Sequence, residues 1–373
     1  MKAWPVLAIL IVQSIICLAH WFLYRTLIDF WWPLSPQSVD ALRISFALLS
    51  VIFIFATILS FRFDNPAIKL FYWLAAIWLG LSNFFLVGAC LAWLADFALR
   101  IALPATARLA ARPFIAATFL LIAAAATVYG MMNARHIRQR HVAVRLPNLP
   151  ECWRGRTALL ISDMHLGNIN GAHFARRIAD MARRLDPEII FLAGDLYDGS
   201  HLDPDSQAAP ILELSPPLGT YFVGGNYEEF GGAAHYEEAI SRAGVRVLHN
   251  ERVVVDGLHL VGIPYASSTY PLQLRTFLES LQLKGGPASI LLNHVPNRLP
   301  VAEHAGINLQ LSGHTHGGQF FPFSWVTRRA FGRFTYGLQR FGDMQVYTSS
   351  GAGTWGPPMR VGTHPEIVLL TFE

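Results

Sequence analysis

Charged residues are scarce in this 373-residue sequence: Asp, Glu, Lys and Arg make up 14% of it, whereas hydrophobic residues make up 53%. A typical soluble domain carries about 25% charged residues. Together with the mean hydropathy of +0.36, this composition excludes an intrinsically disordered chain and a wholly water-soluble one. Cysteine is also rare. The three cysteines exclude a disulfide-stapled secreted scaffold and provide no zinc-type cysteine pairs.

Motifs of nucleotide and nucleic-acid binding are absent. The sequence has no Gly-x4-Gly-Lys-Ser/Thr phosphate loop, and the glycines around Asn226 do not form a dinucleotide fingerprint. The formal net charge of +4 comes from residues 1–133, because basic and acidic residues balance in the rest of the chain. No basic helix or stripe stands out, so we expect no nucleic-acid partner.

Long uncharged segments fill the first third of the chain. Four of them contain no Asp, Glu, Lys or Arg: residues 4–24, 44–61, 70–95 and 113–134. Each reaches the roughly 18–25 residues that a helix needs to cross a bilayer. Buried helices of a soluble core are the alternative, but core helices seldom lack charge over four such lengths. A cleaved signal peptide does not fit, because three more apolar segments follow the first. We predict an integral, multi-pass membrane protein in which residues 1–134 form an all-α transmembrane domain of four helices.

A cluster of arginines follows the fourth apolar segment. Arg135, Arg138, Arg140 and Arg145 lie in residues 135–154, which we interpret as a basic juxtamembrane linker. Because segments rich in Lys and Arg stay on the cytoplasmic side, the cluster predicts that the rest of the chain is cytoplasmic. Arginines in the loops on the other side make this bias small.

The remainder, residues 155–373, changes to short apolar segments separated by helical and turn segments. Amphipathic helices are expected over residues 173–185 and 272–283. Buried strands are expected over residues 157–162, 189–193, 220–223, 252–255, 258–263, 288–293, 308–312, 344–349 and 366–371. This mixture predicts one layered α/β domain.

Polar residues follow five of these predicted strands. The five segments that carry them are Asp163-Met-His165, Gly194-Asp195-Leu-Tyr-Asp198, Gly225-Asn226-Tyr227-Glu228, Asn293-His294 and Gly313-His314-Thr-His316-Gly. Strand ends aim side chains into a common crevice, and carboxylates, imidazoles and an amide together form a hard-to-borderline metal site. A lone Asp-x-His or His294 by itself is explained as well by capping or core packing. Neither capping nor core packing explains the ordered set of five segments.

This ordered set resembles the calcineurin-like metallophosphoesterase family, over roughly residues 155–373. The resemblance implies a four-layer α/β/β/α sandwich with two divalent metal ions, which could be Mn, Fe, Zn or Mg. It implies that Asp163, His165, Asp195 and His316 hold the first metal ion. Asp195 would bridge to the second ion, which Asn226, His294 and His314 complete. It further implies that a hydroxide between the ions attacks phosphorus in line.

The apolar N-terminal part and the segment 351–356 resemble the bacterial membrane-associated branch of this family, of the YkuE and YaeI type. Related proteins hydrolyse UDP-2,3-diacylglucosamine in lipid A biosynthesis. The expected partners are the lipid bilayer and a phosphorylated substrate that could be lipid-linked. A general membrane-tethered phosphodiesterase and a catalytically weak, metal-binding membrane sensor or scaffold are alternatives. The oligomeric state stays open.

One position departs from the family pattern. Tyr227 stands where the family usually has a His that assists the leaving group, while Asp198, which would orient that His, is present. Tyr227 could donate its phenolic proton, although a pKa near 10 makes it a poorer acid. Catalysis could be lost with metal binding kept, or the substrate could need no acid. Pyrophosphate cleavage fits the last case, because a phosphate monoester leaves as a weaker base than an alkoxide.

Aromatic residues and arginines alternate after the Gly-His-Thr-His motif. Residues 320–325 include three phenylalanines and a tryptophan, and Arg328, Arg329, Arg333 and Arg340 follow. Such a segment suits a surface that contacts lipid headgroups. A loop whose aromatics pack on the domain and whose arginines face water explains it equally well.

Overall fold

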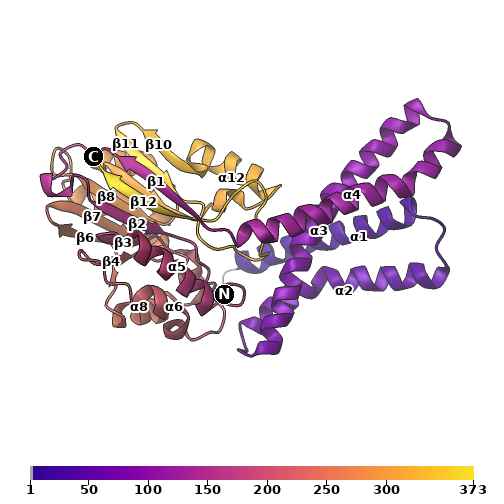
Figure 1. The fold of residues 1–373 in the computed structure, drawn as a ribbon, viewed down its shortest axis with the longest axis horizontal. Coiled ribbons are helices and arrows are strands. Elements are labelled where there is room, and N and C mark those ends of the chain that lie inside the picture. The colour runs from indigo at the N-terminus through magenta and orange to yellow at the C-terminus, as the bar shows by residue number, and fades with distance from the viewer. Residues whose placement is uncertain (1–2) are drawn as a thin grey trace. The chain divides into compact units, whose positions relative to one another are not determined.

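The structure is a computed structural model that describes residues 3–373, and of residues 3–6 and 8 only the backbone. The side chain of Trp4, where the first predicted apolar segment begins, therefore lies outside the described residues. The chain divides into two compact units (Figure 1). One contains Met1–Met132 with Gly356–Met359, and the other contains Asn133–Trp355 with Arg360–Glu373.

The first unit consists of four long helices, α1 (Ala3–Phe30), α2 (Pro36–Ser60), α3 (Pro66–Ala102) and α4 (Ala105–Ala134). Ser35 and Asn65 cap α2 and α3, each followed by a proline at the first helical position. Each of the four helices contains a segment long and apolar enough to cross a membrane. The predicted four-helix domain is thus confirmed. The helices extend beyond the uncharged segments and so include charged residues such as Asp96 and Arg112.

The second unit contains two six-stranded mixed sheets (Figure 1). The first sheet has the order β1-β12-β2-β3-β4-β5. Its strands are β1 (Arg138–Val144), β12 (Glu366–Phe372), β2 (Thr157–Ile161), β3 (Ile189–Leu192), β4 (Thr220–Phe222) and β5 (Arg246–Val247). The second sheet has the order β10-β11-β9-β8-β7-β6. Its strands are β10 (Gly337–Phe341), β11 (Met344–Thr348), β9 (Leu309–Ser312), β8 (Ser289–Asn293), β7 (Leu258–Ile263) and β6 (Glu251–Val255).

Besides its two sheets, the second unit contains several helices. They are α5 (Ala172–Leu185), α6 (Pro204–Leu212), α7 (Asn226–Gly231), α8 (Ala233–Arg242), α9 (Tyr265–Thr269), α10 (Pro271–Ser280), α11 (Leu299–Ala305) and α12 (Phe323–Phe331). Short 3-10 turns are η1 (Glu151–Trp153), η2 (His316–Gly318) and η3 (Gly332–Thr335). One apolar core joins α5, α6 and α8 to the first sheet. A second core lies between the sheets, and a third joins α10 and α11 to the second sheet. This arrangement confirms the predicted four-layer α/β/β/α sandwich.

All nine predicted strands form, with ends within two residues of the prediction, and both amphipathic helices form as α5 and α10. Three strands were not predicted: β1, β5 and β10. β1 and β10 lie at sheet edges and expose polar residues, and β5 is only two residues long. These strands therefore lack the buried apolar pattern on which the prediction relied.

The interpretation of residues 135–154 as a linker is wrong. Arg138–Val144 forms β1, which pairs in parallel with β12. Trp153 is fully buried in the core between the sheets, and its indole nitrogen donates to the Val255 carbonyl at 3.0 Å. The second unit accordingly begins at Asn133 instead of residue 155.

Candidate metal centre

The loops that carry the predicted ligands leave parallel strands at the same edge. β2, β3 and β4 are parallel neighbours in the first sheet, and β8 and β9 are parallel neighbours in the second. Asp163 and His165 follow β2, Asp195 follows β3, and Asn226 begins α7 after β4. His294 follows β8, and His314 and His316 follow β9. The carboxyl ends of parallel strands meet at one sheet edge, so both sheets present their polar residues there.

The structure brings these residues together as two groups of ligand atoms. Asp163, His165 and His316 form one group, and Asp195, His294 and His314 form the other. Within each group the ligand atoms lie within 4.8 Å of one another. All except the partly exposed His314 are buried. Neither group could have been recognised from one strand end alone.

Asp195 lies between the two groups. Its Oδ2 atom is 3.2 Å from Nε2 of His294 and 3.8 Å from Nε2 of His165. In the first group, Nε2 of His316 is 3.4 Å from Oδ1 of Asp163 and 3.0 Å from Nε2 of His165. In the second, Oδ1 of Asn226 is 2.9 Å from Nδ1 of His314. Asp195 is therefore within 4 Å of a histidine from each group.

The backbone at the site is strained. Five of the seven predicted ligands have a left-handed backbone with φ between 47° and 69°; they are Asp163, His165, Asp195, His314 and His316. A non-glycine residue in this region costs on the order of 1 kcal/mol. Such strain persists only where the surrounding structure fixes it, and it concentrates at functional sites.

Two glycines allow the loops to approach the aspartates. A Cβ atom at Gly313 would lie 2.2 Å from Oδ2 of Asp163, and one at Gly225 would lie 2.2 Å from Oδ1 of Asp195. Any side chain at either position would therefore displace a predicted ligand. In place of such contacts, the backbone N–H of His314 donates to Asp163 and that of Tyr227 donates to Asp195.

Burial keeps three of the imidazoles neutral. It lowers the pKa of His165 and of His314 to about 4, and it lowers that of His316 as well. A neutral ring has a free lone pair, which metal ligation requires. For His294, burial alone would lower the pKa, but the Asp195 and Asp163 carboxylates raise it. These two carboxylates therefore favour a positive charge beside them.

His294 shows how the site fits a metal ion. Its Nδ1 atom lies 2.7 Å from the Ala193 carbonyl oxygen, which can only accept, so Nδ1 carries the proton. The buried Nε2 atom has no hydrogen-bond partner, although it faces Asp195. Backbone carbonyls commonly orient metal-ligating histidines in this way. The donor set of imidazole, carboxylate and amide suits a borderline divalent cation.

Glu228 belongs to the predicted motif, but the sequence did not indicate its role. The side chain is fully buried and accepts three backbone N–H groups: Gly225 at 2.7 Å, Asp195 at 2.9 Å and Tyr197 at 3.0 Å. It therefore fastens the Asn226 loop to the Asp195 loop. Burial, followed by the Asp195 charge, raises the pKa of Glu228.

Arg360 was missed entirely, because a single arginine in a loop carries no sequence signal. Its guanidinium is fully buried and donates to the carbonyls of Gly353 at 2.6 Å and Ser350 at 2.7 Å. It also lies 3.1 Å from Nδ1 of His316. A guanidinium only donates, so Nδ1 of His316 is the acceptor and the ring is fixed by this contact. Arg360 thus fixes the His316 ring. Because the neutral ring then carries its proton on Nε2, the atom 3.4 Å from Asp163, ligation through Nε2 requires that proton to leave.

Asp198 and Tyr227, the other two predicted catalytic residues, form no hydrogen bond with each other among the described residues. Asp198 accepts from Ser200 and from the Asn168 N–H at 3.0 Å, and these contacts do not involve Tyr227. The Tyr227 ring packs edge-on against His165, with 4.7 Å between centroids. Burial, then the Asp195 and Asp198 charges, raises the pKa of Tyr227. Asp198 therefore does not orient Tyr227 here, and the phenol is a weaker acid than free tyrosine.

Comparison with known proteins agrees with this geometry. The calcineurin-like phosphoesterase family profile matches residues 156–318. An uncharacterised metallophosphoesterase of Aquifex aeolicus is 30% identical, over 68% of this chain and 98% of that protein. YkuE of Bacillus subtilis, also an uncharacterised metallophosphoesterase, is 26% identical over 71% of this chain and 98% of its own.

A membrane-associated relative is also similar. A Danio rerio transmembrane protein with a metallophosphoesterase domain is 32% identical over 68% of this chain and 62% of its own length. The chain thus spans less than two thirds of that relative. The family match, the near-complete alignment with the Aquifex aeolicus protein and the assembled ligand groups lead to one assignment. The chain belongs to the calcineurin-like metallophosphoesterase family, and it has four helices long and apolar enough to cross a membrane.

Proposed function

We propose that the protein hydrolyses a phosphodiester or pyrophosphate bond in a lipid-linked substrate, using two divalent cations. The observation that carries this proposal is the position of Asp195 between two groups of ligand atoms. A carboxylate in that place can serve two neighbouring cations, and two-metal sites are typical of phosphate ester hydrolysis.

The chain provides ligands for both cations. Asp163, His165 and His316 with Asp195 would hold one cation, and Asn226, His294 and His314 with Asp195 would hold the other. When bound, such cations act as Lewis acids on the phosphoryl oxygens and lower the pKa of water. The protein's own part is to hold the ligands in place. The Ala193 carbonyl fixes the His294 ring, Arg360 fixes His316, and Glu228 fixes the loops of Asp195 and Asn226.

The surroundings of Tyr227 favour a substrate with a good leaving group. With a raised pKa, the phenol holds its proton too tightly to assist departure of an alkoxide. A phosphate monoester leaving from a pyrophosphate needs less assistance, because its second pKa is around 6. This supports pyrophosphate over alkyl phosphodiester bonds, and a nucleoside-diphosphate lipid such as UDP-2,3-diacylglucosamine has such a bond.

A surface beside the site supports a lipid-linked substrate. Helix α12 exposes Trp325 and Val326, and the preceding Phe321 is also more than half exposed. At the other end of α12, Phe331 packs edge-on against His314, with 6.0 Å between ring centroids. The helix thus runs from an exposed aromatic surface to a predicted metal ligand. Aromatic residues and arginines together suit a lipid-headgroup surface.

We also propose that the metal centre faces the cytoplasm. The support is the arginine cluster after α4, namely Arg135, Arg138, Arg140 and Arg145. A nucleotide-linked lipid substrate would also require the metal centre to face the cytoplasm. Cysteine labelling of an engineered exposed position, Arg176→Cys, in intact and in opened cells would test this placement. Labelling in intact cells would contradict it.

The first test is hydrolysis of bis(p-nitrophenyl) phosphate by the purified full-length protein, with and without Mn²⁺. Nitrophenolate is a weakly basic leaving group, so the absence of a good acid would not hide activity. Metal-dependent turnover that is lost in Asp195→Asn supports the proposal and leads on to lipid pyrophosphates.

A folded protein that binds Mn²⁺ without turnover would contradict the proposal. It would favour instead a metal-binding membrane sensor or scaffold, which the Tyr227 position makes the second candidate. Turnover of soluble diesters with none of lipid pyrophosphates would favour a general membrane-tethered phosphodiesterase.

A further inference from the structure

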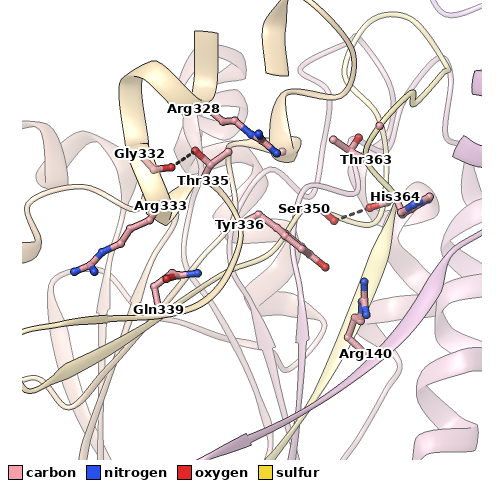
Figure 2. Close-up of a pocket in the computed structure, with 12 residues that line it drawn as sticks. Arg140, Arg328, Gly332, Arg333, Thr335, Tyr336, Gln339, Ser350, Thr363 and His364 are labelled. Carbon is pink, nitrogen blue, oxygen red and sulfur yellow. Dashed lines mark hydrogen bonds between the residues drawn. The ribbon is translucent and has the colours of Figure 1, made fainter. Parts of the chain in front are cut away.

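A cavity of about 530 Å³ lies in the second unit (Figure 2). It is lined from several separate segments: β1, η2, α12, η3, β10 and the stretches around Ser350 and Thr363. Three of the lining residues are arginines, Arg140, Arg328 and Arg333, and no acidic residue is among the residues that line it. Its size is within the range of small-molecule sites.

The cavity borders the metal centre. One lining residue, Gly317, directly follows the predicted ligand His316. Another, Ser350, directly precedes Gly351, where a Cβ atom would lie 2.6 Å from Cβ of Asp163. The cavity is therefore next to the group formed by Asp163, His165 and His316.

The three arginines differ in their availability. Arg333 donates to the Arg340 carbonyl at 2.7 Å and stacks over the Phe334 ring. In Figure 2 its guanidinium points away from Arg140 and Tyr336. The guanidinium of Arg328 has no hydrogen bond or ion pair among the described residues. Arg140 lies 3.7 Å from Glu366 and also interacts with the Tyr336 hydroxyl. Arg328 and Arg140 thus have guanidinium N–H groups that can donate to a ligand.

The Glu366 carboxylate near Arg140 already has hydrogen-bond donors of its own. Glu366 is buried and accepts the hydroxyls of Tyr336 at 2.8 Å and Tyr347 at 3.1 Å, together with the Ser350 N–H at 3.2 Å. Positive charge predominates around the cavity. Burial lowers the pKa of the lining His364, and Arg138, Arg140 and Arg360 lower it further. His364 is therefore neutral at pH 7, and the arginines supply the charge.

We propose that this cavity binds a phosphate group that is not the one attacked, with Arg140 and Arg328 as its ligands. This inference rests on the proposed function, since it assigns to the substrate a second phosphate beside the reacting one. Arginine guanidiniums are well suited to phosphate oxygens, which they can bind through two parallel hydrogen bonds. The phosphate could belong to a soluble anion or to a lipid headgroup.

Binding to the metal-free, full-length protein tests the cavity independently of turnover. Titration calorimetry in EDTA would use inorganic pyrophosphate as the soluble probe and dioctanoyl phosphatidic acid, below its micellar concentration, as the lipid probe. We expect saturable binding that weakens roughly tenfold in Arg140→Gln and in Arg328→Gln. Arg176→Gln, which neutralises an exposed arginine of α5 with no partner among the described residues, is the matched control and should bind as the parent does.

Each outcome of the binding experiment supports or overturns the proposed phosphate site. Loss of both probes in the two variants shows that the cavity recognises phosphate itself, and loss of the lipid probe alone shows a headgroup site. Binding that is absent, or equal in the parent and both variants, overturns the proposal. If wild type binds the probes through Arg140 and Arg328 but never turns over bis(p-nitrophenyl) phosphate, the proposed function fails while the anion site stands.

Discussion

Buried aspartates occur in both units, and their surroundings differ. In the helical unit, Asp96 of α3 is fully buried, and both of its oxygens accept from Arg112 at 2.8 and 3.0 Å. Arg108 and Arg100 lie 3.1 and 3.7 Å from the same carboxylate. In the other unit, Asp163 and Asp195 are equally buried but are surrounded by imidazoles.

The Asp96 carboxylate is fully paired with arginines, whereas the carboxylates of Asp163 and Asp195 have no such partners in the described part of the chain. Three guanidiniums more than neutralise Asp96, and Arg112 also reaches the Asp29 carbonyl and the Phe30 ring, so this cluster ties α1, α3 and α4 together. Three of the four imidazoles beside Asp163 and Asp195 are neutral, because burial lowers their pKa values. Only the pKa of the fourth, His294, is raised by the carboxylates. Two buried carboxylates of this kind are complete only with cations.

The largest effect is expected for Asp195→Asn, the same chemical change that Asp96→Asn makes in the helices. Removing the charge between the two ligand groups should lower turnover of bis(p-nitrophenyl) phosphate by at least about 10³-fold and reduce the content of bound metal. Metal analysis and steady-state kinetics measure both. Retained turnover at the parent's metal content would show that Asp195 does not bridge.

Asp96→Asn should instead affect stability. It leaves Arg108 and Arg112 facing a neutral amide, and breaking a buried ion pair costs about 3 kcal/mol. Thermal unfolding in detergent would show the loss, while kcat of the folded fraction stays at the parent's value. A variant that is as stable as the parent would mean that the cluster contributes little to helix packing.

Arg360→Met tests the positioning of His316. We expect metal affinity to fall, because the His316 ring loses the contact that fixes its orientation. High metal concentration should restore turnover. Arg360→Lys keeps the charge but donates to fewer carbonyls. Its metal affinity should therefore lie between those of the parent and Arg360→Met. Calorimetric titration with Mn²⁺ measures the affinity, and an unchanged value in Arg360→Met would contradict the role.

Tyr227→His should have the smallest effect, and one that depends on the substrate. An imidazole at this position supplies a better acid, so turnover of an alkyl phosphodiester should rise roughly tenfold. Pyrophosphate turnover should change less than about twofold, because its leaving group needs little assistance. Tyr227→Phe is the control and should resemble the parent. Equal gains on both substrates would contradict the leaving-group argument.

Much of this protein could be predicted from local patterns. The nine strands lie where short apolar segments occur, and Asp163, His165, Asp195, Asn226, His294, His314 and His316 follow them at the expected ends. β1 and β10 were missed because edge strands expose polar residues, which makes them resemble loops. The contacts of Asp198, which accepts from Ser200 and Asn168, could not be read from the sequence.

The sequence by itself indicated the membrane character of the helical half, since uncharged segments of about 20 residues are typical of membrane-spanning helices, and it determined which side chains end the strands. The tertiary structure alone decided what completes the site. Glu228 and Arg360 act on Asp195 and His316 across 33 and 44 residues of chain, and the arginines of the cavity come from β1, α12 and η3. No local pattern records such contacts, because a buried charge is positioned by whichever carbonyls and N–H groups the fold leaves unpaired around it.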